Sequence, residues 1–305
     1  MDSVSFQSGW IFYALASPLV FSFVNFGDKF IIEKHIQDTR AMPIYSGIVA
    51  FFTGCVLFII TGFPTLALKD MVLVMVTGMM TSLGAALYFT AIARDEASKI
   101  IVLIQIQPVI VLLLSVVFLN DTISAQQLIG FVLILGAAVA ISLNRDGGGF
   151  KLSAAFYLIL LCDLIWASSL VLFKFVAVES QFSALLPYES WGLALGDLAL
   201  YLFVPSIRNA FLSNLKIVSR RALGFLAINE TIFVVAKLLG LTAVALGPVA
   251  LVSVLGSSQI FFGVVMGAIL TTLAPAIFKE DISWRSLTRK AVLALVMFGG
   301  ILLVN

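Results

Sequence analysis

Charge, histidine and cysteine are scarce in this sequence, and each scarcity excludes a class of protein. Charged residues make up 11% of the 305 residues, whereas soluble domains carry about 25%. The one histidine, His35, cannot form a metal centre by itself, and Cys55 and Cys162 lie inside apolar runs without a metal or redox spacing. A glycine-rich nucleotide loop is also missing. We therefore expect no metal, no cofactor, no nucleic-acid partner and no enzyme activity.

Apolar sequence of membrane-crossing length is abundant instead. Hydrophobic residues make up 61% of the chain, and the mean hydropathy is +1.14, which predicts an all-α integral membrane protein. A helix needs about 20 mostly apolar residues to cross the hydrocarbon core. Ten runs approach this length, at about 9–33, 43–62, 71–93, 98–119, 125–143, 152–178, 184–204, 221–246, 249–273 and 287–304. The first run lacks a preceding basic segment, so we expect a retained helix and not a cleaved signal.

The two halves of the chain resemble each other. Residues 87–93 (LYFTAIA) match residues 239–245 (LGLTAVA), and the same offset places Gln107 opposite Gln259. Five helices is an odd number, so two tandem five-helix halves must cross the membrane in opposite senses, with a site expected between them near the midplane. The sequence thus predicts ten transmembrane helices, arranged as two inverted five-helix repeats at 1–147 and 148–305 around a central cavity.

Basic residues outside the helices gather on one side of this predicted topology. The loops that follow the odd-numbered helices contain Lys34, Arg40, Arg94, Lys99, Arg145, Lys151, Arg208, Lys216, Arg220, Arg221, Lys279, Arg285, Arg289 and Lys290, whereas the opposite side has Lys69. Because cytoplasmic loops carry the excess of Lys and Arg, this asymmetry predicts that the odd loops are cytoplasmic and both termini are outside.

The whole pattern resembles a known group of transporters. Ten helices in two halves, a lysine near the end of the first helix of each half (Lys29 and Lys174), and the stretch 91–141 resemble the EamA-like branch of the drug/metabolite transporter superfamily. The resemblance implies a secondary transporter or exporter of small metabolites with a cavity between the halves. It also implies cytoplasmic termini, so the two orientations stay open.

The strongest candidate site lies in the apolar stretch 223–244, which carries Asn229, Glu230 and Lys237 in its middle. A charge at the centre of a membrane helix costs about 2.5–3.5 kcal/mol on insertion scales, so this helix face should look into protein or a watered cavity. We expect Glu230 to bind a proton or cation, with Lys237 as its partner or as an anchor for a substrate carboxylate. Lys237 lies about 10 Å further along the helix axis, so a partner for Glu230 from another helix, such as Lys174, is an alternative.

The remaining candidates are polar or aromatic side chains within other apolar runs. They are Gln107, Gln259, Asp163, Trp166, Glu189, Trp191, Asn25 and Ser257. An amide both donates and accepts hydrogen bonds, so the two glutamines suit a zwitterionic or polyhydroxylated solute. Alternatively, these groups join helices to one another, for example as a buried pair of Asp163 or Glu189 with Lys237. Asp28 and Asp197 also lie inside apolar runs.

Together these features predict an exporter of small polar or amphipathic, amino-acid-like metabolites in the cell (inner or plasma) membrane. The predicted mechanism is alternating access with protons as the candidate coupling ion, and the predicted assembly is a monomer or a weak homodimer. An uptake carrier or lipid-headgroup flippase of the same fold is the first alternative. A non-transport membrane subunit is the second.

Overall fold

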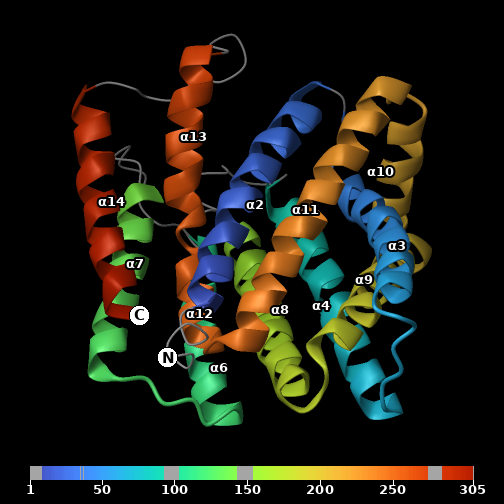
Figure 1. Ribbon diagram of the computed structural model, residues 1–305. Coiled ribbons are helices and arrows are strands. Elements are labelled where there is room, and N and C mark those ends of the chain that lie inside the picture. Colours follow the sequence, from blue (N-terminus) through green and yellow to red (C-terminus); the bar gives the residue numbers. More distant parts are fainter. Residues whose placement is uncertain are drawn as a thin grey trace.

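The computed structural model describes residues 9–34, 36, 38–92, 103–142, 154–273 and 284–304, and these residues form a bundle of helices (Figure 1). No strand occurs in the described part. Six of its helices are long and apolar enough to cross a membrane, or seven if one bent pair at 182–215 counts as a single span. Three further apolar helices are shorter. The all-α membrane fold is confirmed, while the ten spans and the inverted repeat stay predictions.

The helices follow the predicted runs in order. In the first half they are α2 (Gly9–Lys34), the short helix η1 (Thr39–Ala41), α3 (Met42–Ile60), α4 (Leu68–Ile92), α6 (Gln107–Phe118) and α7 (Ala125–Ser142). In the second half they are α8 (Ala154–Glu179), α9 (Phe182–Phe203), α10 (Pro205–Leu215), α11 (Arg220–Leu246), α12 (Val249–Gly256), α13 (Gln259–Leu273) and α14 (Trp284–Val304).

Two of the predicted continuous runs are broken by a two-residue turn. In the run 98–119, residues 105 and 106 form a turn and α6 begins at Gln107, with Pro108 in its first turn. The run starts outside the described residues. Proline lacks a backbone donor and is tolerated in a first helical turn, which explains why a new helix starts here. In the run 249–273, residues 257 and 258 form a turn and α13 begins at Gln259.

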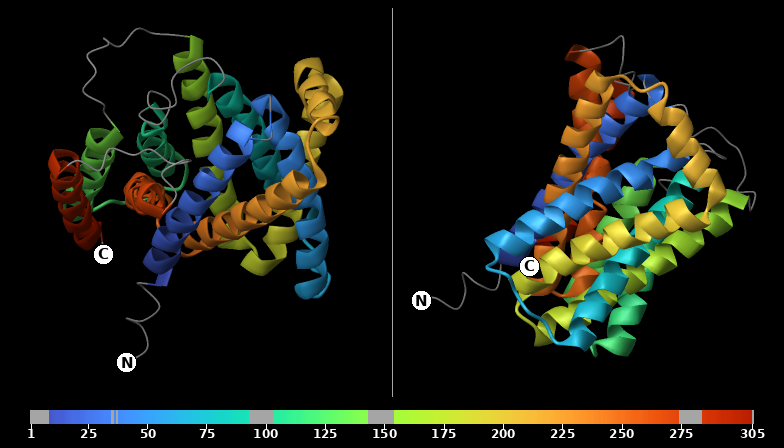
Figure 2. Two further views of the ribbon diagram at one scale, coloured as in Figure 1. Left: turned by 90° about the horizontal axis from the view of Figure 1, so that it is seen from above. Right: turned by 90° about the vertical axis from the view of Figure 1, so that its right-hand side faces the viewer.

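Helices of the first half pack mainly on helices of the second half. Helix α2 lies against α11, α4 lies against α8 and α9, α3 packs on α9, and α7 packs on α14 (Figures 1 and 2). The main apolar core accordingly joins residues from both halves, such as Val74 of α4 with Val171 of α8 and Ala14 of α2 with Val244 of α11. The centre of the molecule is therefore a contact between the halves.

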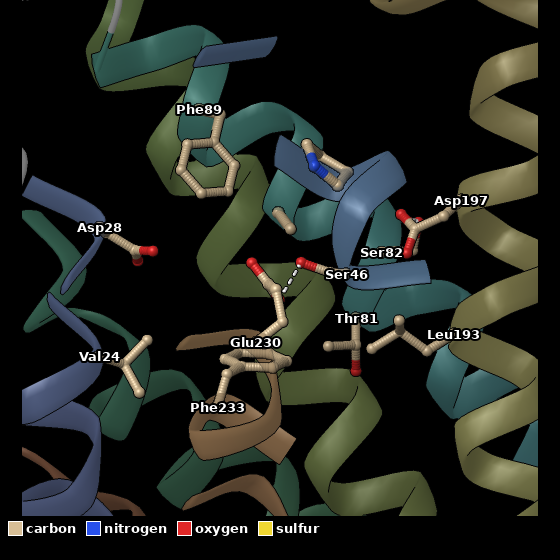
Figure 3. A pocket seen from close by; sticks show the side chains of 12 residues that line it. Val24, Asp28, Ser46, Thr81, Ser82, Phe89, Leu193, Asp197, Glu230 and Phe233 are labelled. Atoms are coloured by element: carbon tan, nitrogen blue, oxygen red, sulfur yellow. Dashed lines mark hydrogen bonds between the residues drawn. The ribbon is translucent and has the colours of Figure 1, made fainter. Parts of the chain in front are cut away.

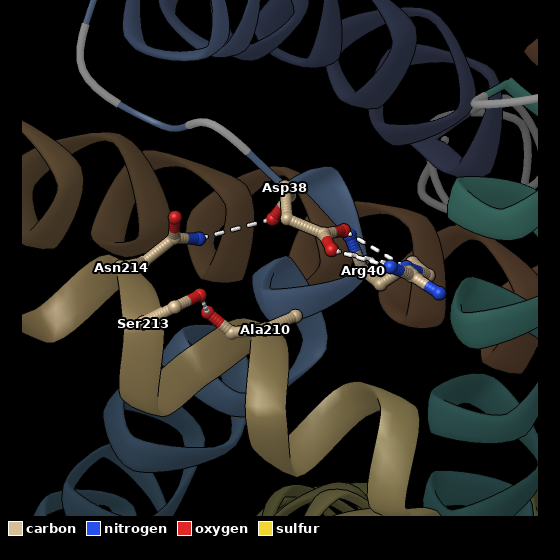
Figure 4. A network of polar contacts seen from close by, with 5 residues as sticks. All are labelled: Asp38, Arg40, Ala210, Ser213 and Asn214. Carbon is tan, nitrogen blue, oxygen red and sulfur yellow. Dashed lines mark hydrogen bonds and ion pairs between the residues drawn. The ribbon is translucent and has the colours of Figure 1, made fainter.

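Helix α10 turns sharply away from α9, with a bend of 96° between them. The long connection at 205–220 thus contains a short helix, which a polar network fixes to the loop between α2 and α3 (Figure 4). The Asn214 amide donates to the carbonyl of Asp38 at 3.0 Å, and the Arg40 guanidinium lies 2.6 Å from the Asp38 carboxylate. Hydrogen bonding from Arg40 holds the pKa of Asp38 below its usual range.

Helices α4 and α9 approach each other through glycines. A Cβ atom on Gly78 would collide with the backbone at Glu189, and one on Gly192 would collide with the backbone at Met75. Trp166 likewise covers Gly84. Not every glycine has this role, because a Cβ atom on Gly256 or Gly263 would have no neighbouring atom within 4 Å.

Substitution of Gly192 tests this seam between α4 and α9. We expect Gly192→Ala to lower the stability of the purified protein by about 1–3 kcal/mol, because overpacking against a backbone cannot be relieved by a rotamer change. Gly136→Ala in α7 is the matched control. It has open space around it and should be neutral or slightly stabilising, because alanine favours the helix. Equal thermal unfolding midpoints for the two variants would contradict the tight seam.

Candidate functional site

A cavity of about 70 Å³ lies between α2, α3, α4, α9 and α11 (Figure 3). Both halves of the chain line it. Its lining consists of Val24, Asp28, Pro43, Ser46, Thr81, Ser82, Ala85, Phe89, Leu193, Asp197, Glu230 and Phe233. It lies nearer the ends of the helices that carry the basic loops, since Asp28 is close to the Lys34 end of α2 and Ser46 is close to the start of α3.

Three carboxylates of the cavity wall come from three different helices. Asp28 of α2 accepts a hydrogen bond from the Asn229 amide at 2.7 Å, and Glu230 of α11 accepts one from the Ser46 hydroxyl at 2.7 Å. Asp197 of α9 accepts a short hydrogen bond from the Ser82 hydroxyl through Oδ1. Each carboxylate therefore has one neutral donor among the described residues, whereas a fully satisfied carboxylate has room for about four.

A buried ion pair lies on the same two helices as Glu230 and Asp197, further from the basic loops. Lys237 of α11 places its Nζ 2.7 Å from Oε1 of Glu189 of α9, with side chains 13% and 2% exposed. The alternative of a buried Glu189–Lys237 pair is therefore confirmed. The suggestion that Lys174 is the partner of Glu230 is wrong, because its ammonium donates to the carbonyl of Ala245 at 2.9 Å.

The first half of this chain is similar to a known protein family. Residues 8–143 match the EamA-like transporter family. This first half is an EamA-like domain. The match agrees with the resemblance read from the sequence, and members of the matched family are transporters. The long apolar helices are those of a multi-pass membrane protein.

Two further similarities support the fold. An uncharacterized protein of Methanocaldococcus jannaschii is 25% identical over 126 residues, which cover 40% of this chain and 87% of that one. That relative is thus a little under half as long as this chain. A protein of known crystal structure is similar over 98% of both chains, with a TM-score of 0.65 and 15% identity. At this identity the similarity concerns the fold alone.

Of the residues predicted for the site, Glu230 alone is among the described residues that line the cavity. Asn229 supports the cavity indirectly, since its amide holds the Asp28 carboxylate. It also lines a second, shallower pocket between α2 and α11, with Gly27 and Phe225. Thus the polar centre of α11 is correctly predicted as inward-facing, and its neighbours on the other helices come from the structure.

The predicted tryptophans and Asp163 lie outside the cavity. The Trp166 indole donates to the carbonyl of Thr81 at 3.1 Å, and Trp191 packs on Phe58 with ring centroids 5.1 Å apart. Asp163 of α8 is fully buried, and neither of its oxygens has a hydrogen-bond partner in the described structure. These contacts give the tryptophans packing roles between helices.

The predicted glutamines share a structural position away from the cavity. Gln107 and Gln259 each begin a helix directly after a two-residue turn. The backbone carbonyl of Gln259 accepts from Ser22 at 3.2 Å. Ser257 is buried in the turn before Gln259, and Asn25 is exposed on α2. None of the four is among the residues that line the cavity, so a direct binding role there is not supported.

Sequence reasoning overlooked the serines that hold the carboxylates. Ser46 and Ser82 are unremarkable inside apolar helices, and a serine there commonly bonds its own backbone. Asp28 and Asp197 could have been predicted as site residues from the sequence, because an acid within a membrane span faces the bundle interior or a cavity by default. The arrangement can bind protons or a cation. Among the described residues there is no group of three or more metal-ligating side chains.

Proposed function

We propose that this chain is a secondary transporter that moves a small metabolite by alternating access between its two halves, with protons as the coupling ion. The observation that carries the proposal is the carboxylate-lined cavity at the contact between the halves. Intramembrane acids of this kind typically mark substrate or proton pathways. The match of residues 8–143 to a transporter family supports the same function.

The packing around the cavity is uneven, which supports a two-state mechanism. On one side α4 and α9 are in backbone contact at Gly78 and Gly192, with the Glu189–Lys237 pair close by. On the other side, the Ser46–Glu230 hydrogen bond and an apolar cluster that contains Met42, Tyr45 and Leu226 join α3 to α11. Alternating access would require the α4–α9 seam and this α3–α11 contact to open in turn. We assign these two contacts as the alternating gates.

The reciprocal helix contacts support a duplicated origin for the two halves. The first helix of each half packs on the third helix of the other, as α2 on α11 and α8 on α4. The second helices pack on each other, and so do the last. A two-fold relation between 1–147 and 148–305 would produce this pattern, and the half-length relative corresponds in size to one repeat.

Filling the cavity tests whether it is the transport route. Ala85 lines the cavity, and we expect Ala85→Trp to reduce protein-dependent flux to that of empty liposomes, since an indole would occupy most of the space. The measurement is counterflow of a panel of labelled amino acids, amines, sugar phosphates and nucleotide sugars in proteoliposomes. Leu128→Trp, at an exposed position of α7, is the control and should transport like the wild type. Unaltered flux through Ala85→Trp would remove the cavity from the route, and a wild type that moves nothing would refute the proposed function.

A further inference from the structure

The cavity wall carries acidic side chains with no basic side chain among the described residues that line it. Asp28, Asp197 and Glu230 contribute three carboxyl groups, and the described lining residues include no lysine or arginine. The basic side chain that acts electrostatically on Asp197 is Lys237, and its ammonium is already bound to Glu189. Among the described side chains here, four carboxyl groups thus share one ammonium, so the site favours a positively charged solute.

One of these carboxyl groups has an unused, deeply buried oxygen. Asp197 is 2% exposed, and its Oδ2 has no hydrogen-bond partner in the described structure, while Oδ1 accepts from Ser82. Its carboxyl group points toward the cavity from α9, opposite Glu230 and Asp28 (Figure 3). A buried oxygen left unpaired destabilises the folded state. A ligand with N–H groups would satisfy it.

The free acceptors call for a ligand that donates several hydrogen bonds from one charged centre. Glu230 is 4% exposed, and one of its two oxygens accepts from Ser46, which leaves the other for a ligand. A primary ammonium has three donors and no acceptor. Its donors match the free acceptors that Asp197 and Glu230 present to the cavity.

The rest of the wall suits a short alkyl chain. Phe89 and Phe233 present aromatic side chains to the cavity, with Val24 and Leu193 beside them, and aromatic faces attract alkylammonium groups. The cavity of about 70 Å³ is well below the roughly 300–1,000 Å³ of pockets for drug-sized ligands. We infer that the cargo of this site is a small primary alkylammonium ion, an inference that rests on the transport function proposed above.

A charge series built on one isopropyl group tests this inference on the wild-type protein. Isobutylammonium, valine, isobutyrate and isobutanol share this branched apolar end and differ in the charged or polar groups attached to it. We expect isobutylammonium to raise the thermal unfolding midpoint of the purified protein saturably, because a ligand that binds the folded state stabilises it by mass action. Valine, isobutyrate and isobutanol should leave the midpoint unchanged, since a carboxylate would face Asp197 and Glu230 and an alcohol has one donor.

Two aspartate variants locate the site. Asp197→Asn should weaken isobutylammonium binding at least about tenfold, which corresponds to about 1.4 kcal/mol. Asp70→Asn is the matched control, because Asp70 pairs with Ser180 and is not among the described residues that line the cavity, and it should bind like the wild type. Equal loss in both variants would contradict the assignment of the site.

The outcomes separate this inference from the transport proposal. If valine stabilises the protein and isobutylammonium does not, the cargo is zwitterionic and the cationic assignment is wrong, while transport stands. The cationic assignment is also wrong if none of the four probes binds but another solute of the panel is transported. If isobutylammonium binds through Asp197 but is not transported in proteoliposomes, the result supports the cation site and contradicts the proposed transport function. The charge series uses the wild type, so it tests the cationic cargo even if Asp197→Asn fails to fold.

Discussion

Glu230→Gln should abolish transport driven by a pH gradient and leave the protein folded. Glu230 is buried in the cavity wall, and Ser46 donates to its carboxyl group. Glutamine has nearly the same shape, and its amide oxygen can accept the same hydrogen bond, but it cannot release and rebind a proton. Flux into proteoliposomes with an imposed pH gradient should therefore fall to that without a gradient.

The measurement compares wild type and variant with and without the gradient, using a solute that the wild type moves. Glu179→Gln, at the exposed end of α8, controls for the loss of a glutamate in general and should keep the response to the gradient. A Glu230→Gln protein that transports like the wild type under both conditions would make Glu230 structural and the coupling assignment wrong.

Lys237→Met should destabilise the protein by about 3–5 kcal/mol, the range for removal of one partner from a buried ion pair. Its ammonium contacts Oε1 of Glu189, and Oε2 of Glu189 has no partner in the described structure. The substitution would leave a nearly inaccessible carboxylate with no opposite charge. The double variant Glu189→Gln/Lys237→Met removes the stranded charge as well, so it should recover most of the loss.

An exposed pair provides the comparison for this effect. Arg40 and Asp38 also form an ion pair, but their side chains are 42% and 26% exposed, and pairs of this kind contribute about 0–1 kcal/mol. Arg40→Gln should therefore shift the thermal unfolding midpoint much less than Lys237→Met. Similar shifts for the two variants, or no recovery in the double variant, would show that the Glu189–Lys237 contact does not stabilise the bundle.

The sequence correctly predicted those features that depend on interactions within a single helix. The apolar run 223–244 is long enough to form a membrane helix whatever surrounds it, and a helical spacing puts Glu230 and Phe233 on one face. Both residues line the cavity, as that face predicted. The start of α6 beside Pro108 follows from the missing donor of proline.

The sequence did not predict which side chains on different helices pair with each other. Lys237 could have joined Asp163, Glu189 or a substrate, and nothing in the sequence fixes how far α9 is shifted along α11. The glycine seam between α4 and α9 sets how closely those helices pack, and the folded bundle places Glu189, not Asp163, within reach of Lys237. Asp163 was left without a partner in the described structure for the same reason.

The sequence alone thus determined that this chain is a helical membrane protein with an inward-facing polar centre in α11, because hydropathy and helical periodicity act over short stretches. It also contained the likeness to EamA-like transporters that the match of residues 8–143 confirms. Only the tertiary structure decided which acids share a cavity. Asp28, Asp197 and Glu230 are far apart along the chain, and they meet because α2, α9 and α11 converge at one depth. That depth depends on packing between helices, a property of the whole bundle.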